Sequence, residues 1–412
     1  MLFLLHFFSC MCIKVAFLAD IQYESQYSPL SNPKEGCHVP INTDSGEIHP
    51  YGQYLCGSTS SLLDSMIKTL KQELRKDDVI FILGDSIIGE FNHQDHYRIL
   101  HELHRKLSSH FKGHTYPVLG GTDLHPDALV SLLAFRKHLK YFADAISIPK
   151  SIRSTFLKGG FYSFTQADVV FITINTLIYS PGFLDDEDDP LGQIAYLQKQ
   201  LEHARASKQH AIIVQYDPIM ISLHTGTYSL PSHRSQQLFK VYRDYVDVIR
   251  NVHAAHYHRD EFKLIHSTED NGIPMFILPS VSPLRLTNPA FRIVTLGPIG
   301  DILDYDQFYF MLAKASQISN PRFHKQYTFS ESYGAAISAS AGVEQTRQVA
   351  YAQGWCTFTS MKYLLWALER DTELWSTFWS HSTALYYDRM QDQICAVRTL
   401  DSARFRSCIN AQ

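Results

Sequence analysis

Short apolar runs alternate with helical patterns along most of this chain. "KVAFLAD", "DVIFILGD" and "TYPVLGG" are each typical of a strand, and the first segment between them places Leu62, Leu63, Met66, Leu70 and Leu74 on one helical stripe. Further strand patterns follow in "DVVFITINT", "HAIIVQYD", "IPMFILPSV" and "FRIVTLGP". This repeated order of strand and helix predicts an α/β layered domain.

The chain has 412 residues, which is enough for one large domain or two ordinary ones. The strand patterns stop before Gln317, and a helical pattern follows. No internal repeat or low-complexity tract interrupts them. We therefore predict one catalytic-type α/β domain at 13–317 and a helical subdomain at 318–412.

The first twelve residues, "MLFLLHFFSCMC", form an apolar run. Spanning a bilayer takes about 20 residues, so the run is too short for a transmembrane anchor. It suits the apolar region of a secretory signal, although the usual basic start is missing. The alternative is a buried first strand with an extension. We predict a signal peptide at 1–12.

Seven cysteines bear on the compartment. Cys37 and Cys56 bracket a loop rich in Gly, Pro, Tyr and Asn and could form a small disulfide ring, and Cys395 and Cys408 could form another. If Cys10 and Cys12 are removed with the signal peptide, Cys356 stays unpaired. The alternative is that the cysteines are reduced throughout. We predict a secreted protein, or one in the lumen of the secretory or lysosomal pathway.

Composition narrows the function. Hydrophobic residues make up 45% and charged residues 19%, which is typical of a globular protein. The net charge is only -4, and no basic run marks a nucleic-acid groove. We expect no nucleic-acid partner.

Polar residues follow several of the predicted strands. Asp20 and Asp85 come directly after apolar runs, and "HAAHYHRDEF" carries the pair His256 and His258. Ligands of α/β sheets collect at the carboxyl ends of strands. A lone Asp there commonly caps a turn or a helix, and 21 histidines produce about one His-x-His pair by chance. Together, in this order, the four residues suggest a metal site.

The motifs "LADIQY", "ILGDS", "YPVLGGTDLHP", "IIVQYDPI" and "HAAHYHRDEF" resemble, in this order, those of the calcineurin-like metallophosphoesterases. "SVSPLRLTNPAFRIV" and the last two motifs are similar to the acid sphingomyelinase-like phosphodiesterases, in the branch without a saposin domain. The resemblance runs from about Val15 to Val294, and the spacing "GCHV…PYGQYLC" also fits a disulfide loop of that branch. It implies a four-layer α/β/β/α sandwich with a helical C-terminal extension.

The resemblance also implies two metal ions held by seven positions, and a histidine that donates a proton. Four of the ligand positions are kept in this chain: Asp20, Asp85, His256 and His258. The other three ligand positions and the proton donor are altered: Gln22, Gly121, Gln215 and Thr122. His125, His224 or His253 could replace the missing acid, and each is otherwise an ordinary loop histidine.

Two-metal hydrolysis needs both ions to neutralise the charge that builds on phosphorus oxygens. With these changes we expect at most one ion, zinc or another divalent metal, or none. We predict a degraded homologue with weak or no hydrolysis that binds a phosphorylated small molecule, a lipid headgroup or an unknown protein partner. The alternative is an active phosphodiesterase, using one metal on phosphocholine-type or nucleotide substrates.

Two further features remain open. The run "DDEDDP" is a solvated acidic loop or, alternatively, a calcium site. Tyr23, Tyr216 and Tyr257 lie beside the ligand positions and could stack on a base or a choline group, or simply pack at strand ends.

Overall fold

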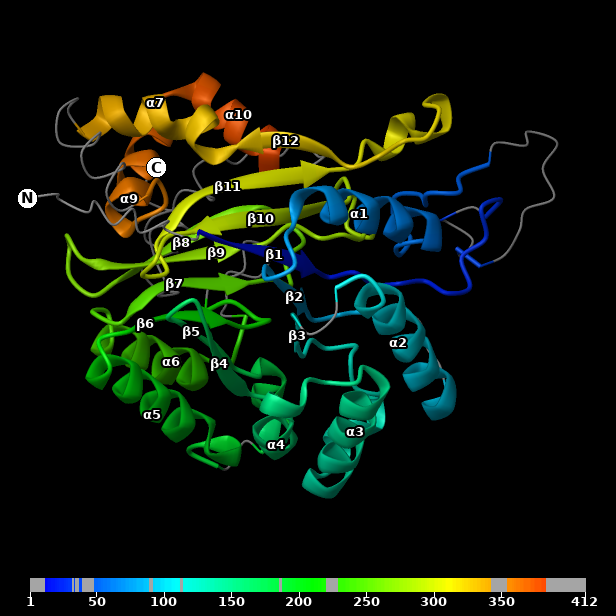
Figure 1. Cartoon of the computed structure of the whole chain (residues 1–412), viewed down its shortest axis with the longest axis horizontal. Coiled ribbons are helices and arrows are strands. Elements are labelled where there is room, and N and C mark those ends of the chain that lie inside the picture. The colour runs from blue at the N-terminus through cyan, green and yellow to red at the C-terminus, as the bar shows by residue number, and fades with distance from the viewer. Residues whose placement is uncertain are drawn as a thin grey trace, which may run out of the picture.

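The structure is a computed structural model that describes residues 12–31, 33, 37–38, 48–88, 92–111, 114–184, 187–219, 229–341 and 354–382. Two six-stranded sheets lie at its centre (Figure 1). The first sheet has the order β12-β11-β10-β1-β2-β3. Its strands are β1 (Ile13–Ala19), β2 (Val79–Leu83), β3 (Thr115–Val118), β10 (Ala290–Leu296), β11 (Ile302–Tyr309) and β12 (His324–Thr328).

The second sheet has the order β4-β5-β6-β7-β9-β8. Its strands are β4 (Tyr162–Gln166), β5 (Val169–Thr173), β6 (His210–Val214), β7 (Ile249–Ala254), β8 (Glu261–His266) and β9 (Gly272–Ile277). In both sheets the central strands run parallel, β1 with β2 and β5 with β6 and β7. Their side chains are buried along nearly their whole length, as expected for parallel strands covered on both faces.

Aromatic rings fill the space between the two sheets. The Phe17 ring of β1 stacks on the His253 ring of β7 with centroids 4.1 Å apart, and the Phe81 ring of β2 lies 5.7 Å from the Phe171 ring of β5. Large apolar rings of this kind dominate the energy of such a core. His253 is therefore a buried part of the core and not the loop histidine that the sequence suggested.

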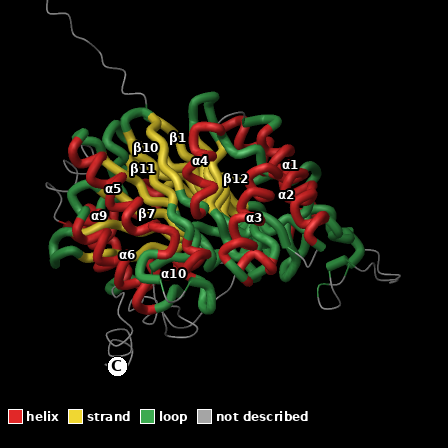
Figure 2. The backbone as a smooth tube through the Cα atoms, turned by 90° about the horizontal axis from the view of Figure 1, so that it is seen from below, coloured by secondary structure: helices red, strands yellow, loops and turns green. Residues whose placement is uncertain are grey.

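Helices cover the outer faces of both sheets (Figures 1 and 2). They are α1 (Ser60–Glu73), α2 (His93–Ser108), α3 (Leu132–Ala145), α4 (Lys150–Gly159), α5 (Gln193–Ala206), α6 (Ser232–Asp244), α7 (Phe329–Ala341), α9 (Phe358–Leu368) and α10 (Thr372–Ser382). Short 3₁₀ turns lie at η1 (Pro126–Val130), η2 (Thr176–Tyr179), η3 (Pro190–Gly192) and η4 (Leu312–Gln317). α5 packs on β5 and β6, and α7 packs on β11 and β12. The predicted α/β sandwich with a helical C-terminal region is confirmed.

Helix α1 shows how the sequence pattern produces these layers. The Thr59 hydroxyl caps its start by accepting from the Leu62 amide, and Leu62, Leu63, Met66 and Leu70 of the predicted stripe are all fully buried. Leu74 of that stripe is the residue at which the helix ends.

The C-terminal region begins with a strand. β12 lies beyond residue 317 and pairs with β11, so the first sheet continues past the predicted domain boundary before the helices α7, α9 and α10 follow. The predicted division at residue 317 stays a prediction. No helix among the described residues is long and apolar enough to cross a membrane.

The predicted bond between Cys37 and Cys56 is present, with the sulfur atoms 2.07 Å apart, and Cys356 is buried. Residues 1–11 of the predicted signal peptide, the pair Cys395 and Cys408, and His224 lie outside the described residues.

Candidate active site

Two carboxylates meet where neighbouring parallel strands end. β1 ends at Ala19 and β2 at Leu83, and their register places these residues side by side. Asp20 and Asp85 therefore follow at the same edge of the first sheet, as the sequence predicted. Asp20 is fully buried, whereas Asp85 is partly exposed.

The backbone at this edge is strained. Asp20, Gln22, Asp85, His256 and His258 all have left-handed φ values, of 46°, 45°, 45°, 76° and 61°. A residue with a side chain is rare in this region, at a cost on the order of 1 to 3 kcal/mol. Five such residues at one edge indicate a functional site.

Asp20 is held by two donors from the second sheet. The Tyr216 hydroxyl donates to Asp20 Oδ1 at 2.8 Å, and the His256 amide donates to Oδ2 at 3.2 Å. Burial, followed by repulsion from Asp85, raises the pKa of the Asp20 carboxyl well above its usual value.

Asp85 contacts the loop after β3. The Thr122 amide donates to Asp85 Oδ1 at 2.9 Å, while the Thr122 hydroxyl donates to the carbonyl of Ile87 at 2.9 Å. That hydroxyl is therefore directed at the backbone. Gly121 is exposed, and the nearest atom to a side chain built there would be Asp85 Oδ1 at 3.6 Å, so the position has room for a ligand that glycine does not supply.

The two histidines of "HAAHYH" follow β7 in different environments. The His256 side chain is 43% exposed, and its Nδ1 lies 3.4 Å from Asp217 Oδ1. His258 is buried, with Nε2 3.6 Å from Asp20 Oδ1. Burial, followed by repulsion from Arg285, lowers the pKa of His258 to about 3. The ring is therefore neutral, and its contact with Asp20 is not an ion pair.

The two glutamines at expected ligand positions differ. Gln22 is buried, and its Oε1 has no hydrogen-bond partner among the described residues. Gln215 is also buried, but the Tyr242 hydroxyl donates to its Oε1, and its amide donates to the carbonyl of Asp217. Both polar atoms of the Gln215 side chain therefore bond to residues other than Asp20.

Tyr216 is the residue at this strand end that reaches the carboxylates. The resemblance implies a Gly-His-x-Pro-Pro motif at "QYDPI", with its histidine two residues before the first proline. That spacing from Pro218 points to Tyr216 instead of Gln215. Tyr216 is buried, and burial followed by repulsion from Asp20 raises the pKa of its hydroxyl. The fixed distance to proline was the signal in the sequence that could have identified it.

Asp217 is a further acidic residue that the sequence reasoning did not assign. The Thr176 hydroxyl donates to Asp217 Oδ2 at 2.7 Å, and His256 lies against its other oxygen. Burial raises the pKa of Asp217, while His256 lowers it. Three carboxyl groups, Asp20, Asp85 and Asp217, thus share one edge of the molecule.

The other candidates lie elsewhere. His125 Nδ1 lies 3.3 Å from the Asp127 carboxylate, and the Tyr23 hydroxyl donates to Glu102. In the acidic run, Asp189 accepts from two amides at the start of α5 and so caps a helix.

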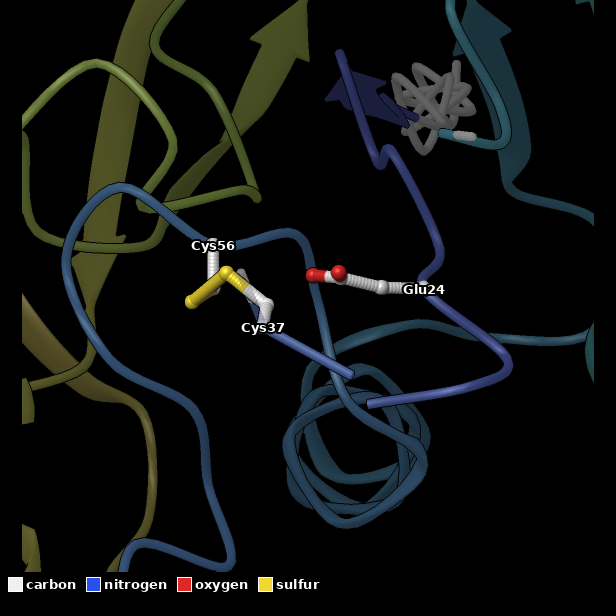
Figure 3. A group of neighbouring side chains, drawn as sticks. All are labelled: Glu24, Cys37 and Cys56. Atoms are coloured by element: carbon white, nitrogen blue, oxygen red, sulfur yellow. A yellow bond between two sulfur atoms is a disulfide. The ribbon is translucent and has the colours of Figure 1, made fainter. Parts of the chain in front are cut away.

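These residues do not fit a pair of metal ions. Gly121 supplies no side-chain ligand, and the Gln215 side chain bonds to Tyr242 and to the carbonyl of Asp217. Among the described residues, only Glu24, Cys37 and Cys56 bring one ligand atom each within 4.8 Å of one another. Figure 3 shows Glu24 directed at the Cys37–Cys56 bridge, whose oxidised sulfurs are not thiolate ligands.

The two six-stranded sheets with carboxylates and histidines at one edge agree with the metallophosphoesterase-type sandwich that the motifs implied. Over nearly its whole length the chain is similar to acid sphingomyelinase-like phosphodiesterases, in agreement with the resemblance seen in its motifs. It is 23% identical over 416 residues to the cyclic GMP-AMP phosphodiesterase SMPDL3A of Rattus norvegicus, covering 95% of this chain and 90% of that protein. It is 24% identical over 436 residues to acid sphingomyelinase-like phosphodiesterase 3b of Homo sapiens, covering 96% and 89%.

A third relative is sphingomyelinase phosphodiesterase D of Dictyostelium discoideum, which is 25% identical over 304 residues, covering 70% of this chain and 67% of that protein. Among solved structures, that of PhoD aligns with a TM-score of 0.46 at 12% identity, covering 77% of this chain and 69% of that one. No family model matches the chain.

Proposed function

We propose that this chain keeps the phosphodiesterase fold but has lost two-metal hydrolysis, and that it binds a phosphorylated small molecule, a lipid headgroup or a protein through the same edge. The observation that carries the proposal is the Tyr216 hydroxyl on Asp20 Oδ1. A neutral phenol therefore lies against this carboxyl at the position where, by its spacing to Pro218, the resemblance implies a histidine ligand.

The charge distribution supports the same conclusion. A two-metal site places about four positive charges among its carboxylates, and these lower the pKa of the attacking water. Here burial and Asp85 raise the pKa of Asp20 and so oppose its charged form. Thr122 supplies no proton near neutral pH, because a hydroxyl is too weak an acid, and this one donates to a backbone carbonyl. A missing general acid alone reduces the rate by roughly 10² to 10⁴-fold.

The first test measures metal content and turnover of the same purified protein. Protein secreted from a eukaryotic host is analysed for bound zinc and other divalent metals, then incubated with sphingomyelin and with cyclic GMP-AMP, the substrate in the name of one relative. We expect fewer than two metal equivalents and turnover at least a hundredfold below that of an active relative. Two equivalents with comparable turnover would reject the proposal.

The second test restores the family residues. A variant carrying Gln22→His, Gly121→Asn, Thr122→His and Tyr216→His should bind two ions and gain phosphodiesterase activity, because the strand ends already lie in place. The same variant with Asp85→Ala added is the matched control and should gain nothing. A replacement at Gln215 instead of Tyr216 should also gain nothing, because Gln215 faces Tyr242.

One observation favours the alternative of an active enzyme with one metal. Asp20 Oδ1 and His258 Nε2 lie 3.6 Å apart. Two ligands about 2.0 to 2.1 Å from a tetrahedral zinc lie roughly 3.3 Å from each other, so these atoms are close to the required spacing. One metal equivalent, with activity that Asp85→Ala abolishes, would favour this alternative.

We also infer that the protein matures in an oxidising compartment. The Cys37–Cys56 disulfide supports this, because such bonds are rare where thiols are kept reduced. Retention of that bond in protein isolated under thiol-blocking conditions, shown by peptide mass, tests the inference.

A further inference from the structure

Histidines crowd the contact between α2, the loop after β3 and α3. Five of them lie within this contact: His93, His96 and His104 on α2, His125 before η1, and His138 on α3. We call the four that touch one another, His93, His96, His125 and His138, the histidine cluster. None belongs to the carboxylate edge described above.

The rings of the cluster are in mutual contact. The His93 and His138 centroids are 4.9 Å apart, those of His125 and His138 are 5.7 Å apart, and those of His93 and His125 are 5.9 Å apart. His96 lies 5.8 Å from His125. A positive charge on one ring would therefore act directly on its neighbours.

The hydrogen bonds of the cluster can form with neutral imidazole rings. Tyr97 shares a hydrogen with His138 Nδ1 at 2.9 Å, and His96 Nε2 lies 3.1 Å from the carbonyl of Asp123. The Nε2 atoms of His93 and His104 are buried and have no partner among the described residues. A protonated imidazole would leave a charged N–H there without an acceptor.

Few charged groups face the cluster from the surrounding elements. Those on α2, the loop, η1 and α3 are Asp95, Arg98, His101, Glu102, Asp123, Asp127 and Lys137, together with the phenols of Tyr97 and Tyr141. Asp95 pairs with Arg98, Glu102 accepts from Tyr23, and Asp123 accepts from the Ser86 and Gly120 amides. His101 lies against the carbonyl of Ala145, and Lys137 lies over the Tyr141 ring. Asp127 contacts His125 alone among the four, and its side chain is 72% exposed.

The pKa values follow from this packing. Burial, then repulsion by neighbouring histidines, lowers the pKa of His138 to about 4 and also lowers that of His93. Burial lowers the pKa of His96, although the Asp123 carbonyl opposes the shift. Burial against α3 lowers that of His104 to about 3.

We propose that the histidine cluster is a pH-sensitive latch that holds the loop carrying Gly121 and Thr122 against α2 and α3 at neutral pH and releases it in acid. The latch reaches the carboxylate edge through two contacts. His96 holds the backbone at Asp123, and the neighbouring Thr122 amide donates to Asp85. Release of the loop would remove this donor from Asp85 and widen the edge. The proposal goes beyond the function of the edge, because it concerns the order of the loop whether or not the site hydrolyses anything.

The sign of the effect follows from linkage. A histidine whose pKa is lower in the packed state than in the open state stabilises packing above about pH 6.5, and this contribution is lost as the pH falls toward the packed-state pKa. For each pH unit by which the pH falls within that interval, each such group raises the equilibrium constant for opening by up to tenfold. With several groups acting together, opening should increase at least a hundredfold between pH 7.5 and pH 5.

Hydrogen–deuterium exchange on the full-length protein tests the latch directly. Protection of amides in α2, 119–131 and α3, corrected for intrinsic exchange, is compared at pH 7.5 and pH 5 with protection of β5 and β6. We expect the latch segments to lose at least tenfold more protection than these strands. Equal loss in both regions would overturn the proposal, and because the readout is not activity, the proposed function could fail without affecting it.

Matched variants separate the cluster from general acid sensitivity. His93→Phe with His138→Asn removes two titrating rings, while Asn can still pair with the Tyr97 hydroxyl. This variant should lose at least tenfold of the pH-dependent opening, whereas His203→Gln, at an exposed histidine of α5, should change nothing. Equal behaviour of the two variants would contradict the latch.

A measurement on the unmodified protein keeps the test valid if the double variant does not fold. Imidazole signals of His93, His96 and His138, followed by NMR from pH 8 to pH 5, should show these three rings remaining neutral until the loop amides lose protection. Individual titration near pH 6.5 with the loop still protected would overturn the proposal.

Discussion

Two buried carboxyl groups in this protein differ in the groups that balance their negative charge. Asp260 accepts from the Arg292 guanidinium on one oxygen and from the Tyr327 hydroxyl on the other, and Arg292 lies 3.9 Å from the Tyr305 ring. Asp20, which follows β1 of the other sheet, accepts from a tyrosine and a backbone amide, and among the described residues no Lys or Arg pairs with it. One carboxyl belongs to a closed ion pair and the other to an open site.

The difference shows which group is structural. Burial alone would lower the pKa of Arg292, but Asp260 raises it overall, so the pair stays charged within the core. Around Asp20, burial and Asp85 both act against the charged form. The negative charge of Asp20 can therefore be neutralised only by a proton or by a bound cation. A carboxyl in this state is typical of a binding site.

The largest expected effect comes from opening the closed pair. Arg292→Met should destabilise the protein by about 3 to 5 kcal/mol, because it leaves Asp260 buried and unpaired. Urea unfolding at pH 7.5 measures this loss. The double variant Arg292→Met with Asp260→Leu should recover much of it, and a double variant as unstable as the single one would contradict the assignment of an ion pair.

The open carboxyl should respond to pH in the opposite direction from an ordinary salt-bridged one. Because the folded-state pKa of Asp20 is raised, its contribution is complete below about pH 4 and is lost as the pH rises. In chelator-treated protein, the free energy of unfolding of Asp20→Asn relative to the wild type should therefore increase with rising pH, by up to about 1.4 kcal/mol per pH unit. Unfolding series at pH 4.5, 6 and 7.5 measure the slope. A gain that does not change with pH would show that Asp20 is already compensated.

A smaller effect is expected at the donor to this carboxyl. Tyr216→Phe should cost about 0.5 to 1.5 kcal/mol in the metal-free protein, because it removes one buried hydrogen bond. If metal is added, the variant should bind it more tightly than the wild type, because an oxygen of Asp20 becomes free. Tyr242→Phe, which removes the buried donor to Gln215, is the control and should not change metal affinity.

The smallest effect belongs to an exposed pair. The Arg205 guanidinium lies 2.6 Å from Asp247 on the surface, with side chains 37% and 58% exposed. Asp247→Asn should cost at most about 1 kcal/mol and less at high salt, because water and ions screen such pairs. Thermal unfolding at 50 mM and 500 mM salt checks this, and a loss as large as that of Arg292→Met would remove the contrast.

The carboxylate edge was predictable because it depends on chain order. Asp20 and Asp85 each directly follow an apolar strand, and neighbouring parallel strands place their carboxyl ends together. The layers were predictable for a similar reason, since buried parallel strands and amphipathic helices leave strong local patterns, as at Leu62 and Met66 of α1.

Other features depend on contacts that leave no local pattern. Asp260 and Arg292 are 32 residues apart, and nothing near either residue identifies its partner. β12 is a half-exposed edge strand, "HKQYT", whose assignment comes only from pairing with β11. The choice between Gln215 and Tyr216 depended on which side chain the strand end turns toward Asp20, and for that the spacing to Pro218 was a better guide than order alone.

The position of β1 has a consequence for biosynthesis. This first strand lies between β2 and β10, with Ile13 opposite Leu296, so the middle of the first sheet joins the two ends of the folded domain. At about 5 to 20 residues per second, a ribosome needs roughly 15 to 55 seconds to deliver β10 after β1. During that interval one edge of β1 stays without its partner, and unpaired strand edges are prone to aggregate. The nascent chain is therefore expected to depend on chaperones until β10 has emerged, when the last hundred or so residues are still to follow.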